Sequence, residues 1–241
     1  MFPYKLGLRR SSKDHRDLKL SVPLNKILPL KCEVPIIRCV YAQGELNSCS
    51  SNVICNQIMN LKDLTDNNYP SRLFQYYISR QIAGNEDEDE GCTYRDAYRG
   101  LAKFGFTDEN LWEYDSNKVF EKPPQKAYDR ANKTLIKKYK SLIPSLYNIK
   151  YAISEGHIVA FGSMLYENFQ PDQNGVIPYP NPNAGILGGH AMTVVGYSDE
   201  TKLFKVLNSW GIDWGLNGMC YMHYDHVVND TFSFEFWVLE K

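Results

Sequence analysis

Residues 208–219 read NSWGIDWGLNGM, the most specific run of letters in the chain. Two shorter runs precede it, QGELNSCS at residues 43–50 and GGHAM at residues 188–192. Read in order, the three runs supply an amide, a thiol, an imidazole and a second amide. Each of these residues alone is ordinary, because a lone cysteine or histidine is usually structural. Their joint occurrence at these spacings is not.

These groups are the ones that a thiol needs to cleave an amide bond. A free cysteine is mostly protonated at neutral pH, and a neighbouring imidazole and a helix N-terminus both stabilise its thiolate. Apolar residues recur at helical spacing from Cys49 to about Asp63, so the sequence predicts a helix that begins at the thiol. A second group must orient the imidazole, and hydrogen-bond donors must meet the developing oxyanion.

The three runs, in this order, resemble the papain/cathepsin family of cysteine peptidases. The resemblance extends from about residue 31 to the end of the chain. It is strongest toward the short members without a signal peptide, known from bacteria and large DNA viruses. It implies an α+β fold of two lobes, with a helical left lobe, a β-barrel-like right lobe and the active-site cleft between them.

The resemblance also implies a role for each matching residue. Cys49 matches the nucleophile, His190 the general base that pairs with it as an imidazolium, and Asn208 the residue that holds the histidine ring. The side chain of Gln43 and the backbone N–H of Cys49 match the oxyanion hole. Trp210 matches the indole that shields the Asn–His hydrogen bond from water, which strengthens that bond.

Four further positions are expected to bind substrate. By helix register, Gly91 and Cys92 fall on the two family glycines whose backbone pairs with substrate, and Gly189 and Ala191 flank the histidine.

The chain also departs from the family pattern beside the nucleophile. Leu46 replaces a cysteine that normally forms a disulfide, which is consistent with a reducing compartment. Ser50 replaces a buried tryptophan, so the packing there must differ.

Hydrophobic periodicity predicts helices followed by strands. Two more helices are expected at about 70–83 and 93–104, the first preceded by a break at 66–68 and the second closed by Gly105. Strands are expected at 157–161, 192–197, 203–207 and 232–239, and Asn217-Gly218 reads as a hairpin turn. The peptidase domain is therefore placed at 31–241, with a helical lobe at about 45–125 and a β-rich lobe at about 126–241.

Residues 1–30 form an N-terminal extension that resembles a pro-segment only in its position. It contains Asp14-His15-Arg16-Asp17, which resembles a motif of the short family members whose role does not follow from the sequence. Our hypothesis is that part of this extension packs along the body and obstructs the cleft. The acidic run Glu86–Glu90 is expected to be a solvated loop. The alternative is a role at the rim of the cleft. The run lacks the ligand spacing of a calcium loop.

Composition narrows the classes of partner and compartment. The chain has 241 residues, 43% of them hydrophobic, and a formal net charge of −1, which gives no electrostatic reason to expect nucleic acid or a membrane as partner. No secretory signal is visible, so an intracellular location is expected, cytoplasmic or inside a virion. The six cysteines form no zinc-type pair, and no metal or cofactor is expected. Most are expected to be reduced, although the disulfide state of Cys32, Cys39, Cys92 and Cys220 is left open.

The sequence therefore predicts a cysteine endopeptidase that acts on polypeptides through a thioester, since no insertion is evident that would restrict it to chain ends. Three alternatives remain. The first is a catalytically silent papain fold that serves as a binding module. The second is a transferase or deconjugase that uses the same triad. The third is a zymogen blocked by its N-terminal segment.

Overall fold

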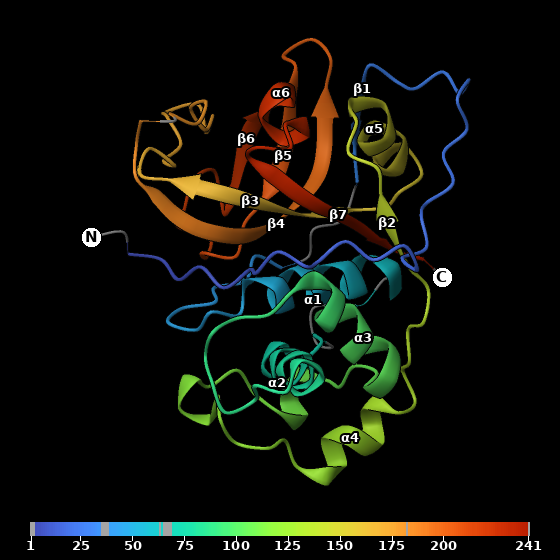
Figure 1. Ribbon diagram of the computed structural model, residues 1–241, viewed down its shortest axis with the longest axis vertical. Helices are drawn as coiled ribbons and strands as arrows, with labels where there is room; N and C mark the ends of the chain where they lie inside the picture. The colour runs from blue at the N-terminus through green and yellow to red at the C-terminus, as the bar shows by residue number, and fades with distance from the viewer. Residues whose placement is uncertain (1–2, 35–38, 63, 65–68, 182, 241) are drawn as a thin grey trace.

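The computed structural model describes residues 3–34, 39–62, 64, 69–181 and 183–240 and has two layers (Figure 1). One layer is helical and the other is built around a β-sheet, with the first helix at the boundary between them (Figure 1). The expected two-lobed α+β architecture is confirmed. Among the described residues, no helix is both long and apolar enough to span a membrane.

The helical layer begins with the helix that starts at Cys49. Its helices are α1 (Cys49–Lys62), α2 (Arg72–Ala83), α3 (Tyr94–Phe104) and α4 (Gln125–Ala131), with short 3-10 helices η1 (Glu109–Leu111) and η2 (Ser116–Lys118). The side chains of Ser71 and Thr93 cap α2 and α3 by accepting backbone N–H groups of the first turn. The three predicted helices are confirmed, and the predicted break at 66–68 lies outside the described residues.

The second layer is an antiparallel sheet of seven strands in the order β2-β7-β3-β4-β5-β6, with β1 paired to β4. The strands are β1 (Lys31–Glu33), β2 (Tyr139–Leu142), β3 (Val159–Tyr166), β4 (Ile186–Ser198), β5 (Leu203–Leu207), β6 (Met219–His223) and β7 (Ser233–Leu239), and helices α5 (Leu146–Ser154) and α6 (Tyr224–Val228) accompany them.

The four predicted strands are confirmed, but β4 begins at Ile186, before the predicted start at Met192. His190 therefore lies within a strand rather than in the turn before it. Asn217 and Gly218 both have positive φ, at 53° and 80°, between the bridged residues Leu216 and Met219, so the predicted hairpin turn is also confirmed.

A buried glutamine of α1 joins the two layers. Gln57 is 2% exposed, and its Nε2 donates to the carbonyls of Ile158 at 3.1 Å and Trp237 at 3.0 Å. Its Oε1 accepts from the hydroxyl of Tyr98 at 2.6 Å. All of its hydrogen-bonding groups are thus used between the helices and the sheet.

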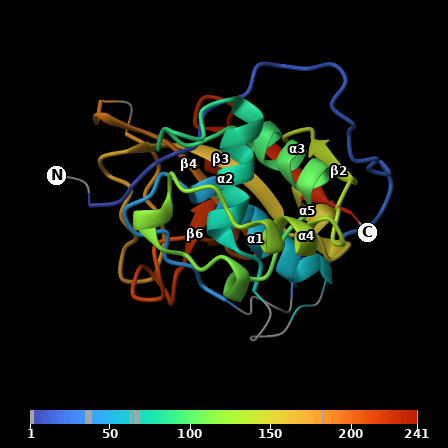
Figure 2. The ribbon, with the colours of Figure 1, turned by 90° about the horizontal axis from the view of Figure 1, so that it is seen from below.

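The N-terminal segment crosses the boundary between the layers. In Figure 1 it runs, in dark blue, from one side of the molecule to the other and then turns past α5. Figure 2 shows the segment after this crossing as a loop standing away from the body. We call residues 4–17 the strap.

We expect Gln57→Leu to lower the free energy of unfolding by about 2–4 kcal/mol, because two buried carbonyls and a buried hydroxyl lose their partner at nearly constant volume. Urea denaturation at pH 7 measures the change. Asn60→Ala removes a more exposed amide of the same helix and is the control, with an expected cost below about 1 kcal/mol. Equal losses in the two variants would contradict this role of Gln57.

Candidate active site

Cys49 is the first residue of α1 and is fully buried. Burial is the largest influence on its thiol and raises the pKa above the usual value. The backbone N–H groups of Ala191, Gly7 and Ser50 act in the opposite direction by stabilising the thiolate. Ala191, the residue after His190, packs in the same buried cluster as Cys49, so β4 lies against the start of α1.

His190 lies on β4, and Asn208 follows β5, the neighbouring strand. The Nε2 of His190 is 2.7 Å from the Oδ1 of Asn208. An amide oxygen only accepts, so Nε2 carries the proton and Nδ1 is the basic nitrogen. Nδ1 has no hydrogen-bond partner among the described residues and is available to a thiol.

Trp210 covers this pair. Its indole stacks on the His190 ring with centroids 4.6 Å apart and an interplanar angle of 26°. His190 is fully buried, and burial lowers its pKa to about 4, although the hydrogen bond with Asn208 raises it in part. The imidazole is therefore neutral at pH 7 in this structure.

Gln43 lies on the other side of the thiol and is also fully buried. Its Nε2 donates to the carbonyls of Lys5 at 3.1 Å and Leu46 at 2.9 Å. Its Oε1 accepts from the hydroxyl of Ser209 at 2.7 Å. The side-chain amide is thus oriented by the residue next to Asn208, so one stretch of chain positions both the partner of the imidazole and the predicted oxyanion donor.

Sequence reasoning missed Ser209 and Tyr114 as supports of this site. Ser209 lies inside the NSW run, which was the signal for it. The hydroxyl of Tyr114 donates to the carbonyl of Gln43 at 2.8 Å and lies 2.5 Å from the hydroxyl of Ser48. No local pattern marks Tyr114, because its partners are far away in the sequence.

The strap occupies the positions that were expected to bind substrate. The N–H of Cys92 donates to the carbonyl of Gly7 at 3.0 Å, and its carbonyl accepts from the N–H of Arg9 at 3.2 Å. The N–H of Leu8 donates to the carbonyl of Gly189 at 3.2 Å. The carbonyl of Gly91 accepts from the guanidinium of Arg9 at 3.3 Å, so three of the four positions, Gly91, Cys92 and Gly189, hydrogen-bond the strap.

Gly91 lines the same channel. It has φ of +74°, and a Cβ there would lie 1.8 Å from the carbonyl oxygen of Gly7. The structure therefore places the nine predicted site residues together beside the strap, at the boundary between the two layers. Their catalytic and binding roles remain predictions.

Two side chains of the strap fit the cleft closely. The ring of Tyr4 stacks on Trp210 with centroids 4.2 Å apart and an interplanar angle of 7°, on an indole that also stacks on His190. Leu8 is 5% exposed and packs in the core cluster that contains Ala191 and Phe234. The strap therefore excludes water from the predicted triad.

Ser50, which replaces the family tryptophan, lies beside Cys92. The Ser50 hydroxyl is 2.9 Å from the Cys92 sulfur, and burial raises the pKa of the Cys92 thiol to about 12. Cys32, Cys92 and Cys220 carry free thiols. No cluster of histidine, cysteine, aspartate or glutamate within the described part of the chain is arranged to hold a metal ion.

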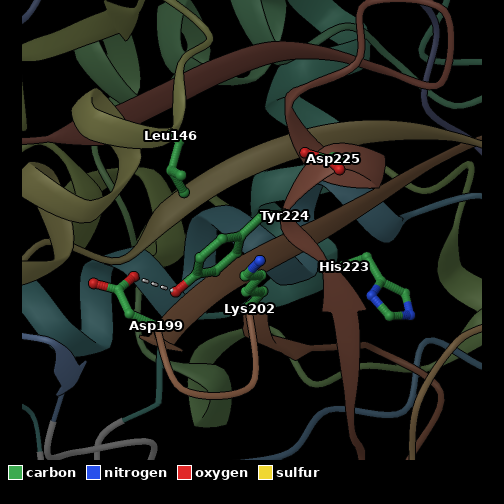
Figure 3. Close-up of a pocket in the computed structure, with 6 residues that line it drawn as sticks. All are labelled: Leu146, Asp199, Lys202, His223, Tyr224 and Asp225. Atoms are coloured by element: carbon green, nitrogen blue, oxygen red, sulfur yellow. Dashed lines mark hydrogen bonds between the residues drawn. The ribbon is translucent and has the colours of Figure 1, made fainter.

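The remaining histidines near the sheet do not join this site. His157 contacts the carbonyl of Leu239 through Nδ1, and His226 is buried against Tyr179 and Phe232. His223 lines a hollow that also contains Asp199 and Tyr224 (Figure 3). There the Tyr224 hydroxyl and the ammonium of Lys150 already satisfy the carboxylate, and none of the hollow's lining residues belongs to the predicted site.

The sequence matches the profile of the papain family cysteine proteases over residues 39–233. An uncharacterized peptidase C1-like protein of Acanthamoeba polyphaga mimivirus is 33% identical over an alignment of 213 residues that covers 83% of this chain and 68% of that protein. A cathepsin B-like cysteine proteinase of Caenorhabditis elegans is 27% identical over 75% of this chain and 56% of its own length.

Solved structures agree with the sequence matches. Xylellain, a cysteine protease from Xylella fastidiosa, superposes with a TM-score of 0.90 at 28% identity, covering 99% of this chain and 97% of that one. The procathepsin B S9 of Trypanosoma congolense shares the fold at a TM-score of 0.75 and 16% identity, covering 98% of this chain and 85% of its own. With a profile match over most of its length and a fold shared with a bacterial protease, this chain belongs to the papain family of cysteine proteases.

Proposed function

We propose that this protein is a cysteine endopeptidase that uses Cys49, His190 and Asn208 as its triad, and that the strap holds it in an inactive form. The observation that carries this proposal is the strap itself. An extended polypeptide lies across Cys49, held mainly by main-chain hydrogen bonds to Cys92 and Gly189. A cleft that binds main chain in this way is suited to unstructured polypeptide substrates.

In the proposed mechanism, the sulfur of Cys49 attacks the carbonyl carbon and its proton passes to Nδ1 of His190. Asn208 holds the Nε2–H of the imidazolium that forms. The oxyanion receives hydrogen bonds from Nε2 of Gln43 and the N–H of Cys49. His190 then protonates the leaving amine, and the thioester is hydrolysed by a water that His190 deprotonates, which restores the thiol.

The strap is not presented to the nucleophile as a substrate. The Cys49 sulfur accepts the N–H of Gly7, whereas the amide of Gln43 is occupied by the carbonyl of Lys5. Attack requires one peptide unit to place its carbon at the sulfur and its oxygen at the oxyanion donors. Here, different peptide units occupy the two places, so the strap blocks the cleft without being in position for cleavage.

The strap also changes the charge state of the triad. Burial raises the pKa of Cys49 and lowers that of His190 to about 4, so the neutral thiol and the neutral imidazole are favoured at pH 7. The ion pair expected from the family resemblance therefore belongs to the open cleft, where water reaches both groups.

The strap is anchored beyond the cleft by the motif Asp14-His15-Arg16-Asp17. Asp17 accepts two hydrogen bonds from the guanidinium of Arg95, at 2.5 and 3.1 Å, and Arg95 also donates to the carbonyl of Ser12 at 2.7 Å. The hydroxyl of Ser11 donates to the half-buried carboxylate of Glu235 at 2.8 Å. These contacts give the motif a role that the sequence alone did not reveal.

We expect Gly7→Ala in the full chain to start hydrolysis of a fluorogenic, unstructured peptide. A Cβ at residue 7 would lie 1.8 Å from the backbone oxygen of Asn47, so the strap cannot stay in place. Loss of about 1.4 kcal/mol of strap binding already raises the open population tenfold, so an increase of about tenfold or more is expected. Lys13→Ala, at an exposed strap position, is the control and should match the starting protein.

Cys49→Ala combined with Gly7→Ala should be silent. A peptidyl epoxide should add once to the Gly7→Ala protein, at Cys49, as read by intact mass. If Gly7→Ala cleaves no peptide and takes no epoxide, the peptidase proposal is wrong and a peptide-binding module is the better account. If the epoxide labels Cys49 but the Gly7→Ala protein cleaves only folded conjugates and not the unstructured peptide, a deconjugase would be favoured.

The pH dependence of Cys49 alkylation should move when the strap is displaced. In the starting protein, the raised thiol pKa makes the thiolate scarce at pH 7, and the rate with iodoacetamide should rise only at alkaline pH. In Gly7→Ala, rehydration lowers the thiol pKa and raises that of His190, so the ion pair forms and the rise should shift to lower pH. Superimposable profiles would contradict control of the triad by burial.

Asp17→Asn should partly activate the full chain. Losing a charge-assisted pair that is largely shielded from solvent weakens the anchor by about 1 kcal/mol, which corresponds to about a fivefold gain in peptide hydrolysis. The gain in peptide hydrolysis should be smaller than that of Gly7→Ala. Added salt should reduce the difference in hydrolysis rate between Asp17→Asn and the starting protein. Asp230→Asn removes the same charge at an exposed site and should have no effect.

A further inference from the structure

We propose that Asp89 is a positioning residue that fixes the spacing between two segments of the helical lobe that border the strap, an inference that rests on the proposed function. It lies in the acidic run 86–90, which the sequence favoured as a solvated loop. The contacts of Asp89 reach Asn47 and, through Tyr76, Gly91, and both of these residues lie against Gly7 of the strap.

The first of these segments is the loop that leads to Cys49. The backbone N–H of Asn47 donates to the Asp89 carboxylate, at 3.1 Å to Oδ1 and 3.4 Å to Oδ2. The side-chain amide of Asn47 donates to the Asp89 carbonyl at 2.5 Å. Asn47 is two residues before Cys49, and its backbone oxygen lies against Gly7 of the strap. Asp89 thus fixes the wall that faces whatever peptide lies in the cleft.

The second segment is reached through Tyr76. Its hydroxyl donates to Oδ1 of Asp89 at 2.5 Å and accepts the N–H of Gly91 at 3.0 Å. Burial, reinforced by Asp89, raises the pKa of Tyr76, so the hydroxyl keeps the proton that it donates. Gly91 precedes Cys92, whose N–H and carbonyl both bond the strap. One carboxylate therefore orients the strand-like edge that pairs with the strap and the loop before Cys49 together.

The backbone of the loop that carries Asp89 is itself held by a buried arginine. Arg80 is fully buried, and its guanidinium donates to the carbonyls of Glu86 at 2.7 Å and Glu88 at 2.9 Å while lying 4.2 Å from the Tyr76 ring centroid. The side chain of Asp87 is exposed, whereas Asp89 is half-buried. Within one run of like charges, the backbone is fixed and one carboxylate is turned inward.

This geometry predicts a selective defect. Asp89 has no hydrogen bond to Cys49, His190 or Asn208 among those found, so its loss should leave the reactivity of the thiol itself unchanged. What should be lost is the alignment of a bound peptide between Asn47 and Cys92. The effect should therefore appear in reactions that require peptide binding and not in those of a small reagent.

The first test uses full-length Gly7→Ala protein, in which the cleft is open. We expect Asp89→Ala to slow labelling of Cys49 by a peptidyl epoxide about tenfold, as for loss of a hydrogen-bonded charge, with Asp89→Asn in between. The iodoacetamide rate should stay within about twofold, because the thiol is untouched. For peptide hydrolysis, KM should rise more than kcat falls. Asp87→Asn is the matched control and should change nothing. An unchanged epoxide rate, or an equal fall in both rates, would overturn the proposal.

The second test uses the otherwise native full chain and needs no catalysis. Amide hydrogen exchange at Asn47, Gly91 and Cys92 should speed up about tenfold in Asp89→Ala, because each N–H belongs to the network that Asp89 holds. It should not change in Asp87→Asn. Unchanged exchange in Asp89→Ala would refute the positioning role even if the protein is a peptidase. If exchange is faster in Asp89→Ala but the Gly7→Ala protein cleaves no peptide, the positioning role of Asp89 is supported and the proposed function is contradicted.

Discussion

The site depends on a rigid joint between two layers of different structure. Cys49 begins a helix, whereas His190 and Asn208 belong to the sheet, so their geometry is only as fixed as the contact between α1 and β4. That contact is made by directional bonds as well as by packing. The Nε2 of Gln57 donates to two carbonyls of the sheet layer while its Oε1 accepts from Tyr98 of α3, and the Gln43 amide is held by Ser209. Hydrogen bonds inside a dry joint are strong and costly to break, so the two halves of the predicted triad keep a single arrangement.

Because water is excluded from this joint, the strap also influences the charge state of the predicted triad. Tyr4 covers Trp210, which in turn covers His190, and Leu8 fills the space beside Ala191. Covering these groups lowers the pKa of His190 and raises that of Cys49, because charge is unfavourable where water is excluded. Under the proposed function, the strap can thus act in two ways at once, by covering the predicted triad and by favouring the neutral thiol of Cys49.

The sequence predicted the fold well where the signal was local and periodic. The helix at Cys49 and the strand at 203–207 follow from apolar spacing alone, and the NSWGIDWG run placed the residues around His190 and Trp210. It could not predict contacts between residues that are distant in the sequence. The run 86–90 is a loop in which Asp87, Glu88 and Glu90 are exposed, as expected, but nothing near Asp89 predicts its hydrogen bonds with Asn47 and Tyr76. The path of the strap was likewise undetermined, because its bonds to Cys92 and Gly189 use main-chain atoms that every residue has.

Close approach explains why the strap fits this cleft in one register. A Cβ on Gly189 would lie 2.4 Å from the carbonyl oxygen of Leu8, and one on Gly91 would lie 1.8 Å from that of Gly7. At these two positions, the strap backbone fits because Gly91 and Gly189 have no side chain. Outside these contacts the strap is held by a stacked tyrosine, one buried leucine and polar anchors at Ser11 and Asp17, rather than by a folded domain. Since no core of its own has to unfold, the strap can leave as a unit once these few contacts are lost. Inhibition of this kind can be reversible in an intact chain, without cleavage of the segment.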